Sequence, residues 1–560
     1  MQERQFKIAV AQLNPIVGDL TANVRKIRDI YVEADGRGVD LVVTPELSVT
    51  GYPLEDLANY PDLLAGAEAA LVALRETTRG HRAALIVGAP VRDANGVYNA
   101  AFVFQEGGLL KLVRKKSLPN YGVFDEMRNF VPEAGTSLPF TLCGRRIGLL
   151  ICEDVWTPAA ARELRDNGAE ILISINASPF RPHILETRVR EVAAGRVAET
   201  GLPLLYVNMT GGQDEIVFDG GSFLMDAAGH RVLQAPQWEE CVFDCDLGVL
   251  PPAVPDEFPD VLENTWRAMM TGVKDYLQKS GFTDVLLGLS GGMDSALVAA
   301  VAGDALGAER VHCVRLPSKY TAELSNTAAE DMCRTWGFSM DTLPIGDVVA
   351  AATKLLSPLA PDGLKQLTRE NMQARARGYL LMTLSNDRDW LLLATGNKSE
   401  IAVGYATLYG DMCGGFSPLK DVFKTTVFAL ARWRNQNRPE GLLGPSGIVI
   451  PVEIIERPPS AELAPDQKDT DSLPPYPVLD AILEEMVEKW TPLDEIVAKG
   501  FDRGVVERVY RMLKRAEYKR RQGAPGPKTS YRAFARDRRF PIVNGFDATM
   551  IGSLREMAGE

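Results

Sequence analysis

The 560-residue chain lacks the features that mark membrane, secreted or nucleic-acid-binding proteins. No apolar run approaches the length of a membrane span, and the formal net charge of −13 argues against nucleic acid as the main partner. The seven cysteines are scattered and odd in number, which is typical of a reducing compartment. Cys241 and Cys245 lack a second Cys or His pair, so we expect no metal site there. We therefore expect a cytoplasmic protein without signal peptide, membrane partner or nucleic-acid partner.

Short apolar runs that alternate with helical patterns indicate an α/β protein. In the first half, strands are predicted at 7–11, 41–44, 84–88, 101–105, 147–151, 171–176 and 204–207, and helices at 20–35 and 187–200. Residues 246–260 are rich in proline and acidic side chains, so we interpret them as a linker. The predicted domains are therefore 1–245 and 261–560. The second contains predicted strands at 285–289, 311–315 and 390–394.

A glycine-rich loop lies between the predicted strand 285–289 and an alanine-rich helical stretch. It reads Gly288, Leu289, Ser290, Gly291, Gly292, Met293, Asp294 and Ser295. Backbone N–H groups at a helix start bind anions, glycine permits close approach, and serine adds hydroxyl donors. Asp294 would repel a bare phosphate, so its presence indicates a magnesium ion beside it. The loop therefore predicts a binding site for pyrophosphate with magnesium.

Other glycine-loop patterns compete with this interpretation. The Walker pattern is absent, because no lysine follows the glycines. Residues 288–292 fit G-x-S-x-G, the nucleophile elbow of hydrolases, but that site needs a later acid and then a histidine. His312 is the only histidine beyond the loop, and a turn without a ligand is a further alternative. Ser-Gly-Gly-x-Asp-Ser resembles the signature of the ATP pyrophosphatases, which implies that residues 288–295 bind ATP.

Three polar residues in the first half stand where apolar runs end. Glu46 and Cys152 each follow a predicted strand, and Lys115 lies in a strand-to-loop transition. Open α/β folds assemble ligand sites at the carboxyl ends of strands. A carboxylate can deprotonate a thiol, the thiolate can attack an amide carbon, and an ammonium can stabilise the oxyanion. Spacing alone leaves a buried structural cysteine and a solvent-facing lysine as alternatives.

Three sequence blocks in this half resemble those of the nitrilase superfamily. They are Pro45-Glu46-Leu47 with Gly51-Tyr52-Pro53, Lys115 with Leu118-Pro119-Asn120-Tyr121, and Ile151-Cys152-Glu153-Asp154-Val155-Trp156. The resemblance implies an αββα sandwich with Glu46 as general base, Lys115 for the oxyanion and Cys152 as nucleophile. Lys116 competes with Lys115, which fits the family pattern better because it stands three residues before Leu118.

An amidase of this kind followed by an ATP pyrophosphatase resembles the glutamine-dependent NAD synthetase family across essentially the whole chain. The resemblance implies that glutamine supplies ammonia, that ATP adenylates deamido-NAD, and that ammonia displaces AMP to give NAD. The expected fold is α/β, with a nitrilase-like αββα sandwich followed by a doubly wound parallel α/β ATP-pyrophosphatase domain. The alternative is an amidotransferase of the same architecture that acts on another acceptor. A homo-oligomer is also implied.

This resemblance assigns ligands to residues in both halves. Glutamine contacts are expected at Tyr121, Glu153 and Ser178, while Glu126 is either an extra carboxylate beside the triad or an exposed loop acid. Further ATP contacts are expected at Thr395, Lys424 and Ser460. Deamido-NAD contacts are expected at Asn371, Glu400, Tyr405, Ala406, Thr407, Leu408 and Lys519. Asp294 and Glu400 are the expected magnesium ligands; a helix brace for Asn371 and a surface charge for Lys519 are the alternatives.

Overall fold

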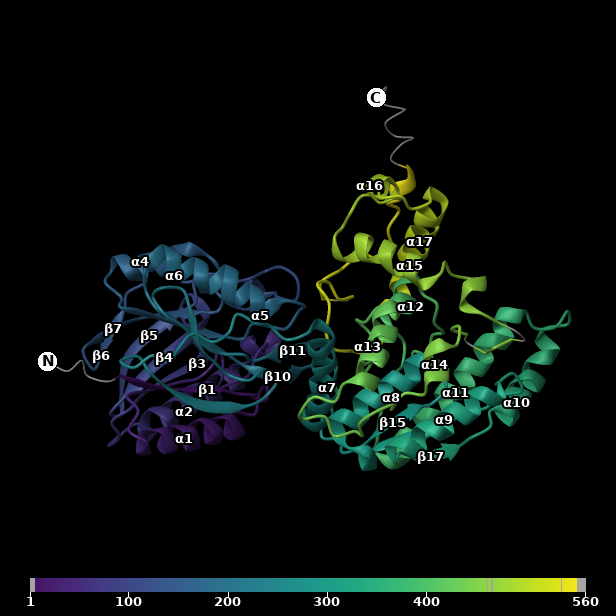
Figure 1. Cartoon of the computed structure of the whole chain (residues 1–560), viewed down its shortest axis with the longest axis horizontal. Coiled ribbons are helices and arrows are strands. Elements are labelled where there is room, and N and C mark those ends of the chain that lie inside the picture. Colours follow the sequence, from purple (N-terminus) through teal and green to yellow (C-terminus); the bar gives the residue numbers. More distant parts are fainter. Residues whose placement is uncertain (1–5, 461, 465–466, 535, 551–560) are drawn as a thin grey trace, which may run out of the picture. The chain divides into compact units, whose positions relative to one another are not determined.

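The computed structural model describes residues 6–460, 462–464, 467–534 and 536–550. The chain divides into two compact units, Met1–Val261 and Leu262–Glu560 (Figure 1). Within the described ranges, no helix has both the length and the apolar character that crossing a membrane requires.

Two six-stranded sheets form the centre of the first unit. The first sheet has the order β14 (Cys241–Asp246), β1 (Lys7–Gln12), β2 (Leu41–Val43), β3 (Ala84–Asp93), β4 (Gly96–Gln105) and β5 (Gly108–Arg114). The second has the order β13 (Arg231–Gln234), β12 (Phe223–Met225), β9 (Leu204–Asn208), β8 (Ile171–Asn176), β7 (Arg145–Ile151) and β6 (Phe140–Leu142). A separate hairpin joins β10 (Thr210–Gln213) and β11 (Ile216–Asp219).

Alternate side chains of one strand enter two different cores, because successive residues point to opposite faces of a sheet. Ile8 and Val10 of β1 pack between the two sheets, together with Ile173 of β8. Ala9 and Ala11 pack on the outer face instead, against α1 (Leu20–Gly36) and α2 (Pro61–Thr77). The outer face of the second sheet is covered by α4 (Pro158–Asp166) and α6 (Ala194–Thr200). These four layers, visible in Figure 1, confirm the predicted αββα sandwich.

The second unit contains a four-stranded parallel sheet in the order β17 (Ser339–Thr342), β16 (Val311–Arg315), β15 (Val285–Gly288) and β18 (Leu391–Leu392). One face packs on α7 (Val261–Lys279), α8 (Met293–Leu306), α9 (Glu323–Trp336) and α13 (Lys424–Gln436). The other packs on α10 (Gly346–Leu356) and α11 (Gln366–Arg388). Helices on both faces of a parallel sheet confirm the predicted doubly wound domain.

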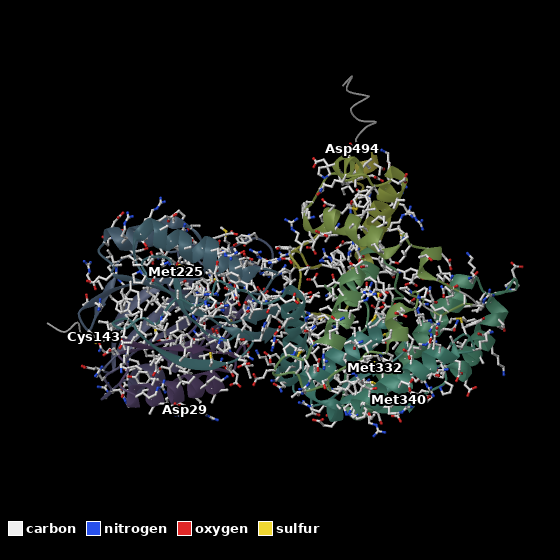
Figure 2. The ribbon with its side chains drawn as sticks, viewed as in Figure 1. Asp29, Cys143, Met225, Met332, Met340 and Asp494 are labelled. Atoms are coloured by element: carbon white, nitrogen blue, oxygen red, sulfur yellow. The ribbon has the colours of Figure 1, made fainter. Side chains whose placement is uncertain are left out.

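Several of the remaining helices of the second unit build a separate apolar cluster. Figure 2 shows the side chains, with Met332 of α9 in the core of the sheet region and Asp494 in the later helical part. That later cluster is formed by α12 (Lys398–Val403), α15 (Tyr476–Leu483), α16 (Leu493–Ala498) and α17 (Arg503–Arg515). The shorter helices α14 (Val452–Glu456) and α18 (Glu517–Arg520) also belong to the second unit. Two other short helices, α3 (Glu153–Trp156) and α5 (Ile184–Glu186), belong to the first unit.

The predicted strands exist, but some bounds differ. The strand predicted at 390–394 is limited to Leu391–Leu392, because the chain then makes only an isolated bridge to Phe416. The helix predicted at 187–200 begins with a π-helical turn, Thr187–Ala193, before α6. Edge strands such as β14 and β17 were not predicted, since neither contains an apolar run longer than three residues.

Candidate active sites

A buried ion pair lies at the carboxyl ends of β2 and β5 in the first unit. Lys115 Nζ lies 2.7 Å from Glu46 Oε1 and 2.8 Å from Glu126 Oε1. The Tyr52 hydroxyl donates to Glu126 Oε1 at 2.9 Å. All four residues are buried, so Glu126 is a neighbour of the pair and not an exposed loop acid.

Two groups that the sequence did not predict hold the Glu46 carboxylate in place. Asn99 Nδ2 donates to Oε1 at 2.7 Å, and the backbone N–H of Ala177 donates to Oε2 at 2.9 Å. Burial lowers the pKa of Lys115, but the carboxylates of Glu126 and Glu46 raise it well above its usual range. Burial raises the pKa of Glu126 to about 7, although Lys115 opposes this shift. The cluster therefore keeps Lys115 charged next to Glu46.

Cys152 lies in the sharp turn between β7 and α3, with φ +45° and ψ −102°. Its backbone N–H donates to the carbonyl oxygen of Ile175 at 2.9 Å, which fixes the turn on β8. Burial, followed by the Glu46 carboxylate, raises the pKa of the Cys152 thiol well above its usual range. The resting group is therefore a neutral thiol near a carboxylate that can accept its proton.

The neighbouring lysine points elsewhere. Lys116 Nζ lies 2.7 Å from Glu163 Oε2 and 3.3 Å from Ser137 Oγ. Its ammonium group is thus paired with α4, and only Lys115 of the two adjacent lysines contacts Glu46. Lys115 is the lysine that the sequence pattern favours, and its role at the oxyanion stays a prediction.

The residues expected to contact glutamine form two groups: Tyr121 with Glu153, and Ser178, which contacts Arg188. The Tyr121 hydroxyl donates to Glu153 Oε2 at 3.0 Å, directly beside the Cys152 turn. Ser178 follows β8, whose Ile175 pairs with Ile151 of β7, so Ser178 and Cys152 come from the same edge of the sheet. The Ser178 hydroxyl accepts from Arg188 Nε at 3.1 Å. That fully buried arginine, which also pairs with Asp219 at 2.8 Å, was not predicted from the sequence.

The glycine-rich loop of the second unit connects β15 to α8. Gly291 has φ +77°, and a Cβ atom there would lie 2.1 Å from the carbonyl oxygen of Ser325, so only glycine fits. The hydroxyls of Ser290 and Ser295 lie 3.0 Å apart, and the N–H of Gly292 donates to Ser290 Oγ at 3.2 Å. Gly292 precedes α8 without a side-chain cap, so the helix N-terminus can receive an anion. No histidine contacts Ser290 among the described residues, unlike in a hydrolase elbow.

Two carboxylates and one lysine meet beside this loop. Lys424 Nζ forms an ion pair with Asp294 and lies 3.6 Å from Glu400 Oε1. Asn397 Nδ2 donates to Asp294 Oδ1 at 3.1 Å, and the same residue caps α12. Burial and the Asp294 carboxylate raise the pKa of Glu400 to about 8, although Lys424 opposes this. Thr395 reaches the same edge because β18 runs parallel to β15.

A second group of predicted residues lies together near α12. The Thr407 hydroxyl donates to Asn371 Oδ1 at 3.0 Å. Lys519 Nζ donates to the carbonyl oxygens of Gly404 at 2.7 Å and Ala406 at 2.6 Å. The structure thus brings Asn371, Tyr405, Ala406, Thr407, Leu408 and Lys519 into one region, with the Leu408 carbonyl accepting from Arg375.

One predicted residue is not connected to these groups. The Ser460 hydroxyl donates to the carbonyl oxygen of Gln467 at 2.5 Å, and no described contact joins it to Asp294, Lys424 or Glu400. Its role as an ATP ligand stays a prediction. By contrast, the structure reveals fully buried Lys398, which pairs with Asp421 at 2.9 Å and Glu488 at 2.6 Å. The local sequence around Lys398, between Asn397 and Glu400, does not indicate that this lysine is buried.

Comparison with known proteins finds a family match for each half of the chain. Residues 7–252 match the carbon-nitrogen hydrolase family, and residues 265–523 match the NAD synthase family. The glutamine-dependent NAD(+) synthetase of Rhodobacter capsulatus is 48% identical over 551 residues, which cover 96% of this chain and 98% of that protein. The one from Xanthomonas campestris pv. campestris is 46% identical and covers 97% of this chain and 98% of the relative.

Solved structures extend the comparison to the fold. Glutamine-dependent NAD+ synthetase from Acinetobacter baumannii, in complex with adenosine diphosphate, is 39% identical with a TM-score of 0.77, covering 97% of this chain and 100% of that one. The structure from Cytophaga hutchinsonii has a TM-score of 0.84 over 99% of this chain and 100% of that one. Its identity of 21% supports the shared fold alone.

Proposed function

This chain belongs to the glutamine-dependent NAD(+) synthetase family, and we propose from its two sites how it makes NAD(+) with the amide nitrogen of glutamine. The first unit releases ammonia from glutamine. The second unit activates deamido-NAD with ATP, and ammonia then displaces AMP. The observation that carries this assignment is the buried Glu46–Lys115 pair beside Cys152 in one unit, together with the Ser290–Ser295 loop beside Asp294 in the other.

In the first site, we assign the proton transfer to Glu46. Its carboxylate takes the thiol proton of Cys152, and the thiolate attacks the amide carbon of glutamine. The Lys115 ammonium stabilises the oxyanion, and the collapsing intermediate releases ammonia with the transferred proton. Water then hydrolyses the thioester to glutamate. Tyr121 and Glu153, which are hydrogen-bonded to each other beside Cys152, would provide a hydroxyl and a carboxylate for the α-amino group of glutamine.

In the second site, the loop amides and serine hydroxyls bind the ATP phosphates, and Lys424 adds a positive charge. Oxygen ligands suit magnesium, and the carboxylates of Asp294 and Glu400 both lie next to the single lysine Lys424 beside the loop. The residues therefore fit the ion, and Asp294 and Glu400 would hold it. Magnesium bound there would neutralise phosphate charge during adenylation. The region of Asn371, Thr407 and Lys519 would orient deamido-NAD for that step.

Two further assignments concern the whole protein. All seven cysteines are thiols without disulfides, which supports a reducing, cytoplasmic location. We also propose a homo-oligomer, because several leucines of the second unit are strongly exposed, namely Leu355, Leu359 and Leu367. Sedimentation of the purified chain tests this assembly, and a monomer at micromolar concentration would contradict it.

The function is tested by incubating the purified chain with deamido-NAD, ATP, magnesium and glutamine. Equal amounts of NAD, AMP, pyrophosphate and glutamate are expected. A parallel screen of other carboxylates tests the alternative of a different acceptor. Absence of NAD with deamido-NAD, together with AMP release on another carboxylate, would replace the proposed acceptor.

A further inference from the structure

Asp154 stands in α3, two residues after Cys152, and is 2% exposed. Its Oδ1 accepts hydrogen bonds from the backbone N–H groups of Ser117 at 2.8 Å and Lys116 at 3.1 Å. Its Oδ2 accepts from the backbone N–H of Ile151 at 3.3 Å. One carboxylate therefore joins the segment that directly follows Lys115 to the residue that directly precedes Cys152.

The turn that Asp154 closes is strained. Cys152 adopts φ +45°, a region that residues with a side chain rarely occupy. Such a conformation persists only where the surrounding structure holds it in place. Here the hydrogen bonds of Ile151 to Asp154, of Cys152 to the Ile175 carbonyl and of Val155 to the Cys152 carbonyl surround the turn on both sides. Of these three bonds, only the one from Ile151 goes to a group, the Asp154 carboxylate, that also binds the backbone next to Lys115.

The carboxylate is suited to this task near neutral pH. Burial raises the pKa of Asp154 to about 6, whereas the backbone N–H groups and the Lys115 ammonium oppose the rise. Above that pH the ionised group accepts all three hydrogen bonds, and bonds to a charged acceptor are stronger than neutral ones. The charged group that faces Asp154 is Lys115; its other partners are backbone amides.

We propose that Asp154 is a positioning residue of the glutaminase site, which sets the separation of the Lys115 ammonium and the Cys152 thiol. It does so by fastening together the two backbone segments that carry them. This inference rests on the proposed roles of Lys115 and Cys152. Since a misplacement of about 1 Å can cost on the order of 100-fold in rate, weakening this link would slow turnover without removing any group assigned to glutamine.

The test compares Asp154→Asn and Asp154→Glu with the matched variant Asp226→Asn. Asparagine keeps the shape but faces one of the three N–H groups with its own NH₂, and glutamate keeps the charge but is one methylene longer. Asp226 likewise accepts two backbone N–H bonds, at 2.9 and 2.8 Å, in the turn after β12 and outside the site. The readouts are kcat and KM for glutamine, NAD formation from ammonium salts, and alkylation of Cys152 by iodoacetamide.

We expect kcat with glutamine to fall by about 100-fold in Asp154→Asn and less in Asp154→Glu. The KM for glutamine and the ammonium-supported rate should stay close to wild type, and Cys152 alkylation should slow in parallel with kcat. Asp226→Asn should match wild type in every assay. If kcat is partly recovered in Asp154→Glu, the charged hydrogen-bond acceptor matters. A side chain that only fills space would not need that charge.

Four results would overturn the proposal. An unchanged kcat would show that Asp154 sets no geometry, and a rise in KM alone would make it a glutamine-binding group. Equal loss of glutamine- and ammonium-supported activity, or failure of both variants to fold, would make it a folding determinant. The proposed function would fail in a different way, because wild-type protein would then form no NAD with glutamine, or Cys152→Ala would retain that activity.

Discussion

The Nζ atom of Lys115 lies 2.7 Å from Glu46 Oε1, and the side chains of both residues are fully buried. Glu126 Oε1 lies 2.8 Å from the same ammonium nitrogen. Two carboxylates therefore share one positive charge away from water, where an uncompensated negative charge is costly. The structure relieves this excess by favouring the protonated form of Glu126, whose pKa burial raises to about 7.

Replacing Glu126 by glutamine should change how stability depends on pH. Between about pH 4.5 and 7 the unfolded chain has released the Glu126 proton, whereas the folded chain still holds it. The unfolded state thus binds fewer protons, so this group makes wild-type stability fall as pH rises. Relative to Glu126→Gln, wild type should lose about 2–3 kcal/mol between pH 5 and pH 8.

Pulse proteolysis in urea, read from fragments of the first unit, measures this difference without assuming that both units unfold together. Glu68→Gln is the matched control, because Glu68 is exposed on α2. The difference in free energy of unfolding between wild type and Glu68→Gln should be the same at every pH. If the difference between wild type and Glu126→Gln is also the same at every pH, Glu126 ionises freely in the folded protein.

Replacing Cys152 by alanine should separate the two activities. The variant lacks the nucleophile but keeps the second unit, so glutamine-supported NAD formation should be lost while ammonium salts still support it. Cys143→Ala is the control: Cys143, labelled in Figure 2, lies between β6 and β7 and has no assigned role. Residual glutamine-dependent NAD formation in Cys152→Ala would assign the nucleophile to another group.

Much of the architecture could be predicted, because strands buried on both faces leave continuous apolar runs. β8 is one example: all six of its residues, Ile171–Asn176, are buried, and its bounds were predicted correctly. β14 is a counterexample, since its polar residues Asp244 and Asp246 interrupt the apolar pattern, and its place in the sheet depends on pairing with the distant strand β1. Strand pairing between residues far apart in sequence leaves no local signal.

The residues of the candidate sites also divide into those with a local sequence signal and those without one. Glu46, Cys152 and the Ser290–Ser295 loop follow buried strands, so local sequence could identify them. Asn99 and Arg188 could not be found in this way, because their partners, Glu46 and Asp219, are 53 and 31 residues away. Which of two adjacent lysines turns inward is likewise decided by tertiary contacts.

Replacing Gly291 by alanine should disable the second site alone. The new Cβ would lie 2.1 Å from the Ser325 carbonyl oxygen, and the backbone has φ +77°. The loop must therefore shift, which should raise the KM for ATP and lower ammonium-supported NAD formation by about 100-fold. Glutamine hydrolysis measured as glutamate release without ATP should persist. Gly346→Ala, where nothing lies within 4 Å, is the control, and equal effects of the two substitutions would contradict the assignment.

Replacing Glu400 by glutamine should raise the magnesium requirement. The substitution removes one of two carboxylates proposed as ligands and leaves Asp294 paired with Lys424. Losing one charged ligand should raise the magnesium concentration for half-maximal AMP formation by about tenfold. The measurement is a magnesium titration at fixed ATP with ammonium as the nitrogen source, which keeps the first site out of the assay. Glu440→Gln, at an exposed position of the same unit, should match wild type. If Glu400→Gln lowered the maximal rate at every magnesium concentration without moving the midpoint, Glu400 would act on deamido-NAD and not on the metal.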